Sequence, residues 1–400
     1  MANEEYTQID PGPVVCRTPV PEVLLDFNFG ARVQVPEGNW RVRIIDMGAS
    51  TVVCDMQVSK TTVGTTKHYF IPWRVEIYRD GELKVTETLN LSGKRVLIRF
   101  CSGAMGDSLA WIPYVEEFRK KHGCEVWCAI SPVMAELLAP AYPDLHFVAP
   151  RERPGGLYAS YYVGCFFPSD NRTYQPMSWK RTGLQGAAAE ILGLPRQEIR
   201  PRLPEEDAGR IIKEPYVCIA VQASSQPKYW NNPMGWMEVV AWLKERGYRV
   251  LCIDREKCYG DSWHKNLIPW GAEDFTGNHP LKERMEMLRH ADFFIGLASG
   301  LSWLAWAAGI PVVMISGFSL PMTEFSTPYR IINYHVCNGC WEDDRFDFEH
   351  GRFDWCPRHQ EDKEKQFECT RAIASPQVIS AIQRLMEDHG LDPQTDQKES

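Results

Sequence analysis

The stretch Lys94–Pro113, which reads KRVLIRF, CSGAMG and DSLAWIP, decides the fold of this chain. Its first part is an apolar run that is typical of a buried β-strand. A loop with Gly103 and Gly106 follows, and a helix is predicted to begin at Asp107 or Ser108. A strand, a glycine-containing loop and a helix in this order predict the first crossover of an α/β domain.

Downstream of this stretch, apolar strand segments alternate with helical segments. The pattern predicts one Rossmann-like unit over residues 94–205 and a second over 206–330, joined by a charged, Pro-containing linker near 200–215. Ligands of such units bind beyond the C-terminal ends of the strands. We therefore expect an α/β protein whose ligand site lies in a cleft between two such domains.

Upstream of the stretch, the pattern is different. From about residue 20 to residue 91, short alternating runs are separated by Gly, Pro or Asp turns. Such alternation predicts antiparallel strands in a β-barrel or sandwich, so we expect an N-terminal β-barrel or assembly domain over 1–93 that starts with a polar tail. At the other end, residues 373–400 predict one helix and an acidic tail.

Composition limits the class of partner. The chain has 400 residues, 44% of them hydrophobic, and a formal net charge of -8. An acidic chain without a dense Lys/Arg cluster is a poor candidate for nucleic-acid binding. The N-terminus lacks a secretory signal pattern, and the uncharged run 293–315 is interrupted by Gly, Ser and Pro in the manner of strand, helix and strand. We therefore expect a cytoplasmic protein with no membrane partner.

The glycine loop of the opening stretch is the first candidate site. Gly103 and Gly106 allow the backbone to pass close to a ligand. Asp107 at the helix start has two explanations, because an acidic residue there caps a helix and can also act chemically. The sequence around it does not separate these two roles.

A second loop, VQASSQPKYWNN (221–232), follows the first strand of the second unit. Ser224, Ser225 and Lys228 offer hydroxyl groups and one cation to an anionic ligand, although a loop lysine is more often simply solvated. Most of the 14 tryptophans fall in apolar helix faces and are predicted to be core. Trp111 and Trp230 lie near the predicted cleft and are the two that we consider for substrate contact.

A third loop, GLASGLSW (296–303), precedes an apolar helix. Backbone N–H groups at Ser299, Gly300 and Ser302, together with the helix dipole, would suit a pyrophosphate. The alternative is a capped core helix without a ligand. This loop and the Lys228 loop are predicted at neighbouring strand ends, which favours a shared anion site.

Four of the 13 cysteines cluster in a polar insert over 331–372, with the pattern Cys337-x2-Cys340-x15-Cys356-x12-Cys369. Four thiolates at such spacing predict a closed structural site for Zn or a single Fe. His335, His350 and His359 in or near the insert are predicted to face solvent rather than to bind the metal. The other nine cysteines lie mainly in apolar strands, where a thiol behaves as a small hydrophobic group.

Several of these motifs together resemble a known family. SGAMGDSL (102–109) with Pro113 resembles the GD-x-L-x-x-x-P start of bacterial heptosyltransferases, and the Lys228 and Ser299 loops resemble their phosphate-binding loops. The β-domain and the four-cysteine insert make the chain similar to the autotransporter heptosyltransferases. One departure is that lipopolysaccharide heptosyltransferases have Asp-Thr-Gly-x-x-His where this chain has Ala298-Ser299-Gly300 and Trp303, so its nucleotide contacts are expected to differ.

The resemblance implies a type B glycosyltransferase fold and transfer of heptose from ADP-heptose to serine hydroxyls of an autotransporter adhesin, with inversion. It also implies a dodecameric ring and one structural iron per chain on the four cysteines, with zinc as an alternative. For this transfer we expect a single displacement in which Asp107 removes the serine proton, while Lys228 and the amides near Ser299 stabilise the leaving ADP.

Two other functions remain open. The chain could be a non-catalytic scaffold that binds a nucleotide sugar or glycan, or a zinc-ribbon reader of nucleic acid. The acidic insert disfavours the second of these.

Overall fold

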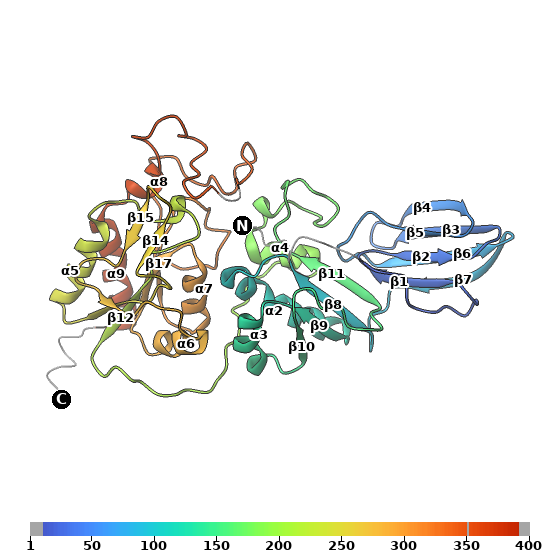
Figure 1. Cartoon of the computed structure of the whole chain (residues 1–400), viewed down its shortest axis with the longest axis horizontal. Helices are drawn as coiled ribbons and strands as arrows, with labels where there is room; N and C mark the ends of the chain where they lie inside the picture. Colours follow the sequence, from blue (N-terminus) through green and yellow to red (C-terminus); the bar gives the residue numbers. More distant parts are fainter. Residues whose placement is uncertain (1–10, 350–351, 392–400) are drawn as a thin grey trace. The chain divides into compact units, whose positions relative to one another are not determined.

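The computed structural model describes residues 11–349 and 352–391 of the chain (Figure 1). The predicted tails at 1–10 and 392–400, and His350, lie outside the described residues. The chain divides into two compact units. Among the described residues, the C-terminal unit contains 104–110 and the chain from residue 200 onward, and the N-terminal unit contains the chain up to residue 103 together with 111–199.

The N-terminal unit contains a seven-stranded sheet with the order β10-β9-β8-β11-β1-β2-β5. The first four strands are parallel, as the alternating pattern predicts. They and the associated helices are β8 (Arg95–Phe100), α2 (Met105–His122), β9 (Glu125–Ala129), α3 (Pro132–Leu138), η1 (Ala139–Ala141), β10 (Leu145–Val148), β11 (Ala159–Val163), η2 (Trp179–Arg181) and α4 (Gly183–Ile191).

The opening strand and helix are therefore confirmed as β8 and α2, with the helix beginning at Met105 rather than at Asp107 or Ser108. Helix α2 belongs to both units, because its first turns fall within 104–110. It ends before Gly123, whose φ of 61° suits the glycine that commonly terminates a helix.

The N-terminal strands are antiparallel, as predicted, and they form two sheets. A four-stranded sheet has the order β4-β3-β6-β7, while β1, β2 and β5 extend the seven-stranded sheet, with β1 parallel to β11. The strand order thus joins the N-terminal strands to the α/β strands, although the predicted boundary at residue 93 is not itself tested. The strands are β1 (Leu24–Asn28), β2 (Arg32–Val35), β3 (Trp40–Asp46), β4 (Thr51–Val58), β5 (Thr61–Gly64), β6 (Trp73–Arg79) and β7 (Glu82–Thr88).

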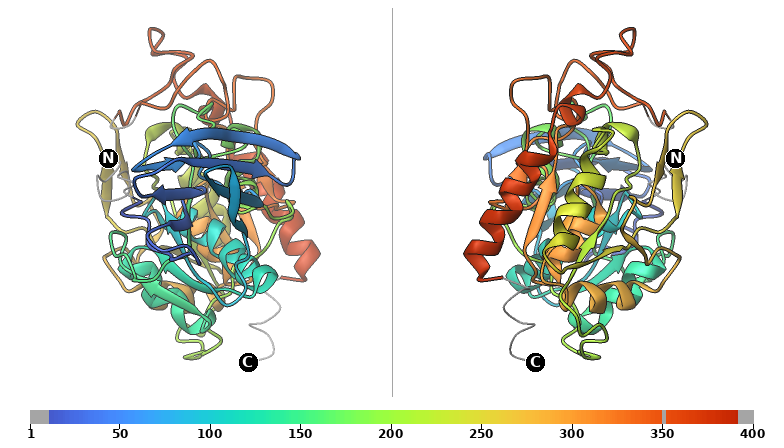
Figure 2. Two further views of the ribbon diagram at one scale, coloured as in Figure 1. Left: turned by 90° about the vertical axis from the view of Figure 1, so that its right-hand side faces the viewer. Right: turned by 90° about the vertical axis from the view of Figure 1, so that its left-hand side faces the viewer.

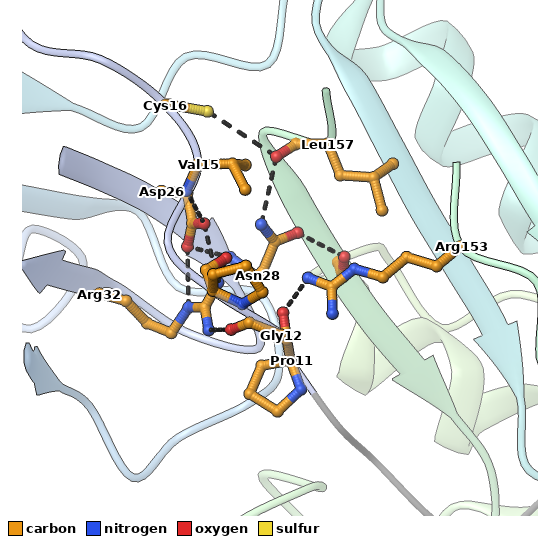
Figure 3. A network of polar contacts seen from close by, with 11 residues as sticks. Pro11, Gly12, Val15, Cys16, Asp26, Asn28, Arg32, Arg153 and Leu157 are labelled. Atoms are coloured by element: carbon orange, nitrogen blue, oxygen red, sulfur yellow. Dashed lines mark hydrogen bonds and ion pairs between the residues drawn. The ribbon is translucent and has the colours of Figure 1, made fainter. Parts of the chain in front are cut away.

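A buried polar network, which we call the junction network, lies where β1 meets β11 (Figure 3). Arg32 donates to both carboxylate oxygens of Asp26, each at 2.8 Å, and to the carbonyl of Gly12 at 2.7 Å. Asn28 and Ser160 are bonded through their side chains at 2.6 Å, across the β1–β11 pair. The Asp26–Arg32 pair links β1 to β2 and the Asn28–Ser160 bond links β1 to β11, so the loss of one partner would leave a buried polar group unmatched.

The C-terminal unit is organised on a parallel sheet with the order β16-β13-β12-β17-β18-β19. Helices α5 and α9 lie side by side on one face, and α6 and α7 cover the other (Figures 1 and 2). The elements are β12 (Tyr216–Ile219), η3 (Gln226–Lys228), α5 (Gly235–Glu245), β13 (Arg249–Cys252), β16 (Glu273–Asp274), α6 (Leu281–Arg289), β17 (Phe294–Leu297), α7 (Gly300–Ala307), β18 (Val312–Ile315), β19 (Arg330–Ile331), α8 (Glu368–Arg371) and α9 (Ser375–His389).

This strand order explains why two predicted loops come together. The chain runs outward from β12 to β13 and β16, and then returns to place β17 on the other side of β12. The loops after β12 and β17 therefore leave the sheet at the point where the order reverses, which is where such sheets bind ligands. Lys228 follows β12 and Ser299 follows β17.

A hairpin of β14 (Cys258–Gly260) and β15 (Lys265–Leu267) is a feature that the sequence pattern did not predict. Its strands are too short and exposed to show a clear alternation. Gly260 has a φ of 146°, and a Cβ at this position would collide with the carbonyl of His264, so the hairpin requires glycine here.

The uncharged run 293–315 forms β17, α7 and β18, as predicted. Across the described residues, 11–349 and 352–391, no helix combines the length and the apolar character needed to cross a membrane.

Candidate functional site

The first turns of α2 and α7 meet within the C-terminal unit. A Cβ on Gly106 would lie 3.4 Å from the Cα of Gly300 and 3.2 Å from the Trp303 ring, and a Cβ on Gly300 would lie 3.3 Å from the Gly106 nitrogen. Glycine at both positions therefore permits the close approach. Helix N-termini present unpaired N–H groups and partial positive charge, so two of them together favour an anion.

Asp107 lies in the first turn of α2 and is half-buried. Its carboxylate is near enough to Lys228 to raise the pKa of that ammonium. The structure thus brings together Asp107, Lys228 and the start of α7, three features that come from separate parts of the sequence. Ser108, the next residue, is fully buried, and its hydroxyl has no hydrogen-bond partner among the described residues.

Lys228 lies at the end of the 3-10 turn after β12. Its Nζ donates to the Ser224 hydroxyl at 3.4 Å and lies 5.8 Å from the centre of the Trp341 ring. Burial lowers the pKa of Lys228, and it outweighs the opposite effect of the Asp107, Glu324 and Glu342 carboxylates. A cation that has lost part of its hydration gains more than an exposed one from an anionic ligand.

Ser225 adds a buried donor to the same loop. Its side chain is 1% exposed, and its hydroxyl has no partner within the part of the chain that the structure describes. A buried hydroxyl without a partner is costly in a folded protein unless water or a ligand satisfies it. Ser225 is therefore a candidate ligand contact beside Ser224 and Lys228.

Two acidic residues near Lys228 were missed by sequence reasoning. Glu324 pairs with Arg330 at 2.9 Å. Glu342 accepts from the Leu320 amide at 2.9 Å and from the Thr323 hydroxyl. Burial, with a further contribution from Glu324, raises the pKa of Glu342 to about 7. Both acids come from irregular segments after β18, where acidic residues are ordinary surface residues and gave no signal.

The predicted residues of the α7 loop have distinct placements. Ser299 precedes α7 in an extended conformation, and its side chain makes no capping hydrogen bond. Ser302 is fully buried and donates to the Leu297 carbonyl at 2.5 Å, so its hydroxyl is used within the fold. Gly300 makes the contact with Gly106 that is described above. Contact of Ser299, Gly300 and Ser302 with a substrate stays a prediction.

The two tryptophans considered for substrate contact are buried. Trp230 is 3% exposed, and its indole N–H donates to the Ile373 carbonyl at 2.9 Å. Trp111 is fully buried and donates to the Leu184 carbonyl at 3.0 Å. Both rings therefore have packing roles. Gly103 is exposed and belongs to the N-terminal unit, so the structure does not relate it to Lys228.

The four predicted metal ligands lie near one another in the insert. Burial raises the pKa of the Cys369 thiol, and the nearby sulfur atoms of Cys337, Cys340 and Cys356 raise it further. Three of the four are buried, and Cys337 is half-buried. Thiols in such surroundings give up their protons when a cation binds. Four thiols are the donor types of a closed Fe or Zn site, and the donor atoms that lie within 4.8 Å of one another in the described part of the insert are those of Cys337, His359 and Glu368.

His359 is a further donor at this place, contrary to the prediction that it faces solvent. Its Nε2 lies 3.4 Å from the Cys337 sulfur, and donor atoms of Cys337, His359 and Glu368 all lie within 4.8 Å of one another. The spacing Cys356-x2-His359 is a common metal-ligand spacing and could have indicated this role. The structure thus offers six candidate donors, of which the four thiols form the all-sulfur set.

Two segments of the chain match family profiles. Residues 21–81 match the N-terminal domain of glycosyltransferase TibC, and residues 171–347 match glycosyltransferase family 9, the heptosyltransferases.

Full-length relatives cover most of the chain. The autotransporter heptosyltransferase BAHTCr of Citrobacter rodentium is 50% identical over 366 residues, which are 91% of this chain and 89% of the relative. TibC of Escherichia coli H10407 is 49% identical over the same shares. BimC of Burkholderia thailandensis, described as an inactive autotransporter heptosyltransferase, is 37% identical over 91% of this chain and 86% of its own length.

The crystal structure of TibC is also similar. It has a TM-score of 0.91 at 47% identity, covers 95% of this chain and 100% of its own, and is described as an iron-containing dodecameric glycosyltransferase. A second TibC structure with the same TM-score, identity and coverage is a complex with ADP-D-β-D-heptose.

Proposed function

This chain belongs to the autotransporter heptosyltransferases and has their type B glycosyltransferase fold, and we propose that it transfers heptose from ADP-heptose to serine hydroxyls of an autotransporter adhesin. The observation that carries the proposal is the placement of Asp107 beside Lys228 and the start of α7. An acid, a cation and unpaired amides are the groups that such a transfer needs.

The proposed reaction is a single displacement. The Asp107 carboxylate accepts the proton of the acceptor serine while the serine oxygen attacks the anomeric carbon of heptose. The bond from that carbon to the phosphate oxygen breaks, and ADP leaves with the electron pair. Lys228 and the amides at the start of α7 stabilise the charge that grows on the diphosphate. Attack from the side opposite to ADP inverts the anomeric centre.

Substitution Asp107→Asn tests this proposal. Loss of a general base is expected to lower the rate of transfer by about 10² to 10⁴-fold, measured by mass spectrometry of an adhesin fragment with ADP-heptose. ADP binding should persist, because Asp107 does not contact the diphosphate in this mechanism. Asp144→Asn, at an exposed acid paired with Arg119 of α2, is the matched control. Normal transfer by Asp107→Asn would remove Asp107 as the base.

A non-catalytic scaffold is the second candidate, and BimC favours it, since that relative is described as inactive. The mass of the adhesin after incubation distinguishes an active heptosyltransferase from a scaffold. Purified protein incubated with ADP-heptose and an adhesin fragment should add one heptose mass per modified site. Binding of ADP-heptose without any mass increase would support the scaffold.

We propose that Cys337, Cys340, Cys356 and Cys369 hold one structural iron per chain, with zinc as the alternative. The electrostatic effect of the other three cysteines on Cys369 supports a shared site, and the iron-containing TibC supports iron. A bound ion would cross-link the insert without taking part in the displacement. Metal analysis together with the visible absorption spectrum separates the two, because iron thiolates absorb visible light and zinc thiolates do not.

We also propose a large homo-oligomer, a dodecamer as described for TibC, in the cytoplasm. Exposed apolar side chains support assembly. The edge strand β4 exposes Val53 at 49% and Met56 at 52%, and the segment around the β14–β15 hairpin exposes Trp263 at 89% and Trp270 at 85%. Light scattering on Val53→Ser and Trp263→Ser should show smaller particles for the surface that forms the contact, and fractionation tests the location.

A further inference from the structure

The four-cysteine insert has little regular structure of its own. Between β19 and α9, the described residues contain only α8, which is four residues long. Most of its backbone hydrogen bonds are short-range turns, and its aromatic side chains pack around Phe318 and Trp355, so a metal on the four cysteines would cross-link turns that are distant in the segment.

This insert supports the loop that carries Lys228. The amide of Gln226 donates to the Phe353 carbonyl at 2.8 Å. The Asn231 side chain donates to the Thr370 hydroxyl at 2.8 Å and to the Gln226 and Tyr229 carbonyls at 3.1 and 2.9 Å. Asn231 thus ties both ends of the 3-10 turn to the insert. Thr370 follows Cys369 directly, so the tie begins next to a metal ligand.

A third contact between the insert and the loop is made by Lys228 itself. The ring of Trp341, the residue after Cys340, lies 5.8 Å from the Lys228 ammonium. Trp341 is held by a hydrogen bond from its amide to the Phe318 carbonyl at 3.1 Å. Residues that flank two of the four cysteines therefore contact the loop at Asn231 and at Lys228.

The far side of the insert packs on the sheet. A Cβ on Gly317, just after β18, would lie 2.7 Å from the Cys369 carbonyl, and the Gly339 amide donates to the Gly317 carbonyl at 2.9 Å. The insert is thus fixed between the end of β18 and the Lys228 loop. A change in the shape of the insert would therefore alter the contacts of the Lys228 loop.

We infer that the cross-linked insert positions Lys228 for the diphosphate of the donor, with Thr370 and Asn231 as positioning residues. The inference rests on the proposed function, since it assumes an ADP-linked donor. It gives the four-cysteine site a role in donor binding within a single chain, separate from any role in assembly.

The first test removes the metal from the full-length protein by chelation and measures ADP affinity by titration calorimetry. Affinity should fall by about ten-fold or more, while circular dichroism shows that the helices persist, and re-addition of iron should restore it. Equal ADP affinity with and without the metal would overturn the inference.

The second test keeps the metal and removes the hydrogen bond between Asn231 and Thr370. Thr370 is fully buried, so Thr370→Val preserves its shape while the acceptor for Asn231 is lost. ADP affinity should fall by roughly five-fold, the usual effect of one hydrogen bond, and KM for the donor should rise with little change in kcat. Thr327→Val is the matched control, because its hydroxyl bonds to the Val312 carbonyl away from the loop.

A double substitution shows whether Thr370 acts through Lys228. In a Lys228→Met background, Thr370→Val should have no further effect on ADP affinity. A full additional loss, or an unchanged affinity of Thr370→Val alone with its iron retained, would overturn the inference. Failure of the unmodified protein to bind ADP would instead overturn the proposed donor, and the inference with it.

Discussion

The junction network in the N-terminal unit and the surroundings of Lys228 in the C-terminal unit compensate buried charge in different ways. In the junction network, Arg32 makes a two-bond ion pair with Asp26, and its remaining N–H groups reach the Gly12 and Pro13 carbonyls. Lys228 donates one long hydrogen bond, to Ser224, and burial lowers its pKa. Arg32 is therefore neutralised by a direct ion pair within the chain, whereas the hydrogen bond that Lys228 donates goes to a neutral hydroxyl.

This difference indicates that the junction network has a structural role and that the surroundings of Lys228 bind a ligand. Removing one partner of a buried ion pair leaves an isolated buried charge, so the fold depends on the match being kept. Around Lys228, a partly desolvated cation lies in the same loop as the Ser225 hydroxyl, which has no hydrogen-bond partner among the described residues, and both would gain from an anionic ligand. A pKa lowered by burial next to a specific acid is an arrangement that active sites use.

The largest expected effect is on stability at the junction network. Asp26→Asn leaves Arg32 buried without its counter-charge, so the free energy of unfolding should fall by about 3–5 kcal/mol in urea denaturation. ADP affinity should not change. Asp55→Asn is a matched control, because Arg41 bonds to both oxygens of Asp55 in an exposed pair, and its effect should be much smaller. Equal losses in the two variants would contradict the comparison.

The next effect is on ligand binding at Lys228. Lys228→Met should weaken ADP binding by about 10 to 100-fold, because hydrogen bonds to charged groups contribute roughly 1.5–3 kcal/mol. Thermal stability should stay the same or increase, since a desolvated ammonium is removed. Lys228→Arg controls for charge. A stability loss comparable with that of Asp26→Asn would show that Lys228 is structural.

The smallest effect is a dependence on pH. Because the pKa of Lys228 is lowered, the ammonium loses its proton at a lower pH than an exposed lysine, and ADP affinity should start to fall there. The free energy of unfolding changes with pH in the opposite direction to ADP affinity. Between the lowered pKa and that of an exposed lysine, the unfolded chain binds more protons than the folded one, so the contribution of Lys228 to stability rises with pH. Calorimetry across alkaline pH should show the fall in the parent protein and its absence in Lys228→Arg.

Sequence reasoning was most successful where the signal is local. The strand, loop and helix of Lys94–Pro113 and the strands that precede Lys228 and Ser299 all depend on residues that are close in the chain. Periodicity and spacing report which face of an element is buried and which ligands are near in sequence. These predictions placed Lys228 and the start of α7 at neighbouring strand ends, but they did not place Asp107 beside Lys228.

Contacts between distant segments were decided only by the tertiary structure. The pairing of β1 with β11, the acids Glu324 and Glu342 near Lys228, and the bond from Asn231 to Thr370 each join residues that are far apart in the chain. An alternating pattern identifies a strand but not its partner, and a loop acid looks the same whether it is solvated or buried against a lysine. The sequence by itself determined the elements and the types of chemical group, and packing determined which of those groups share a site.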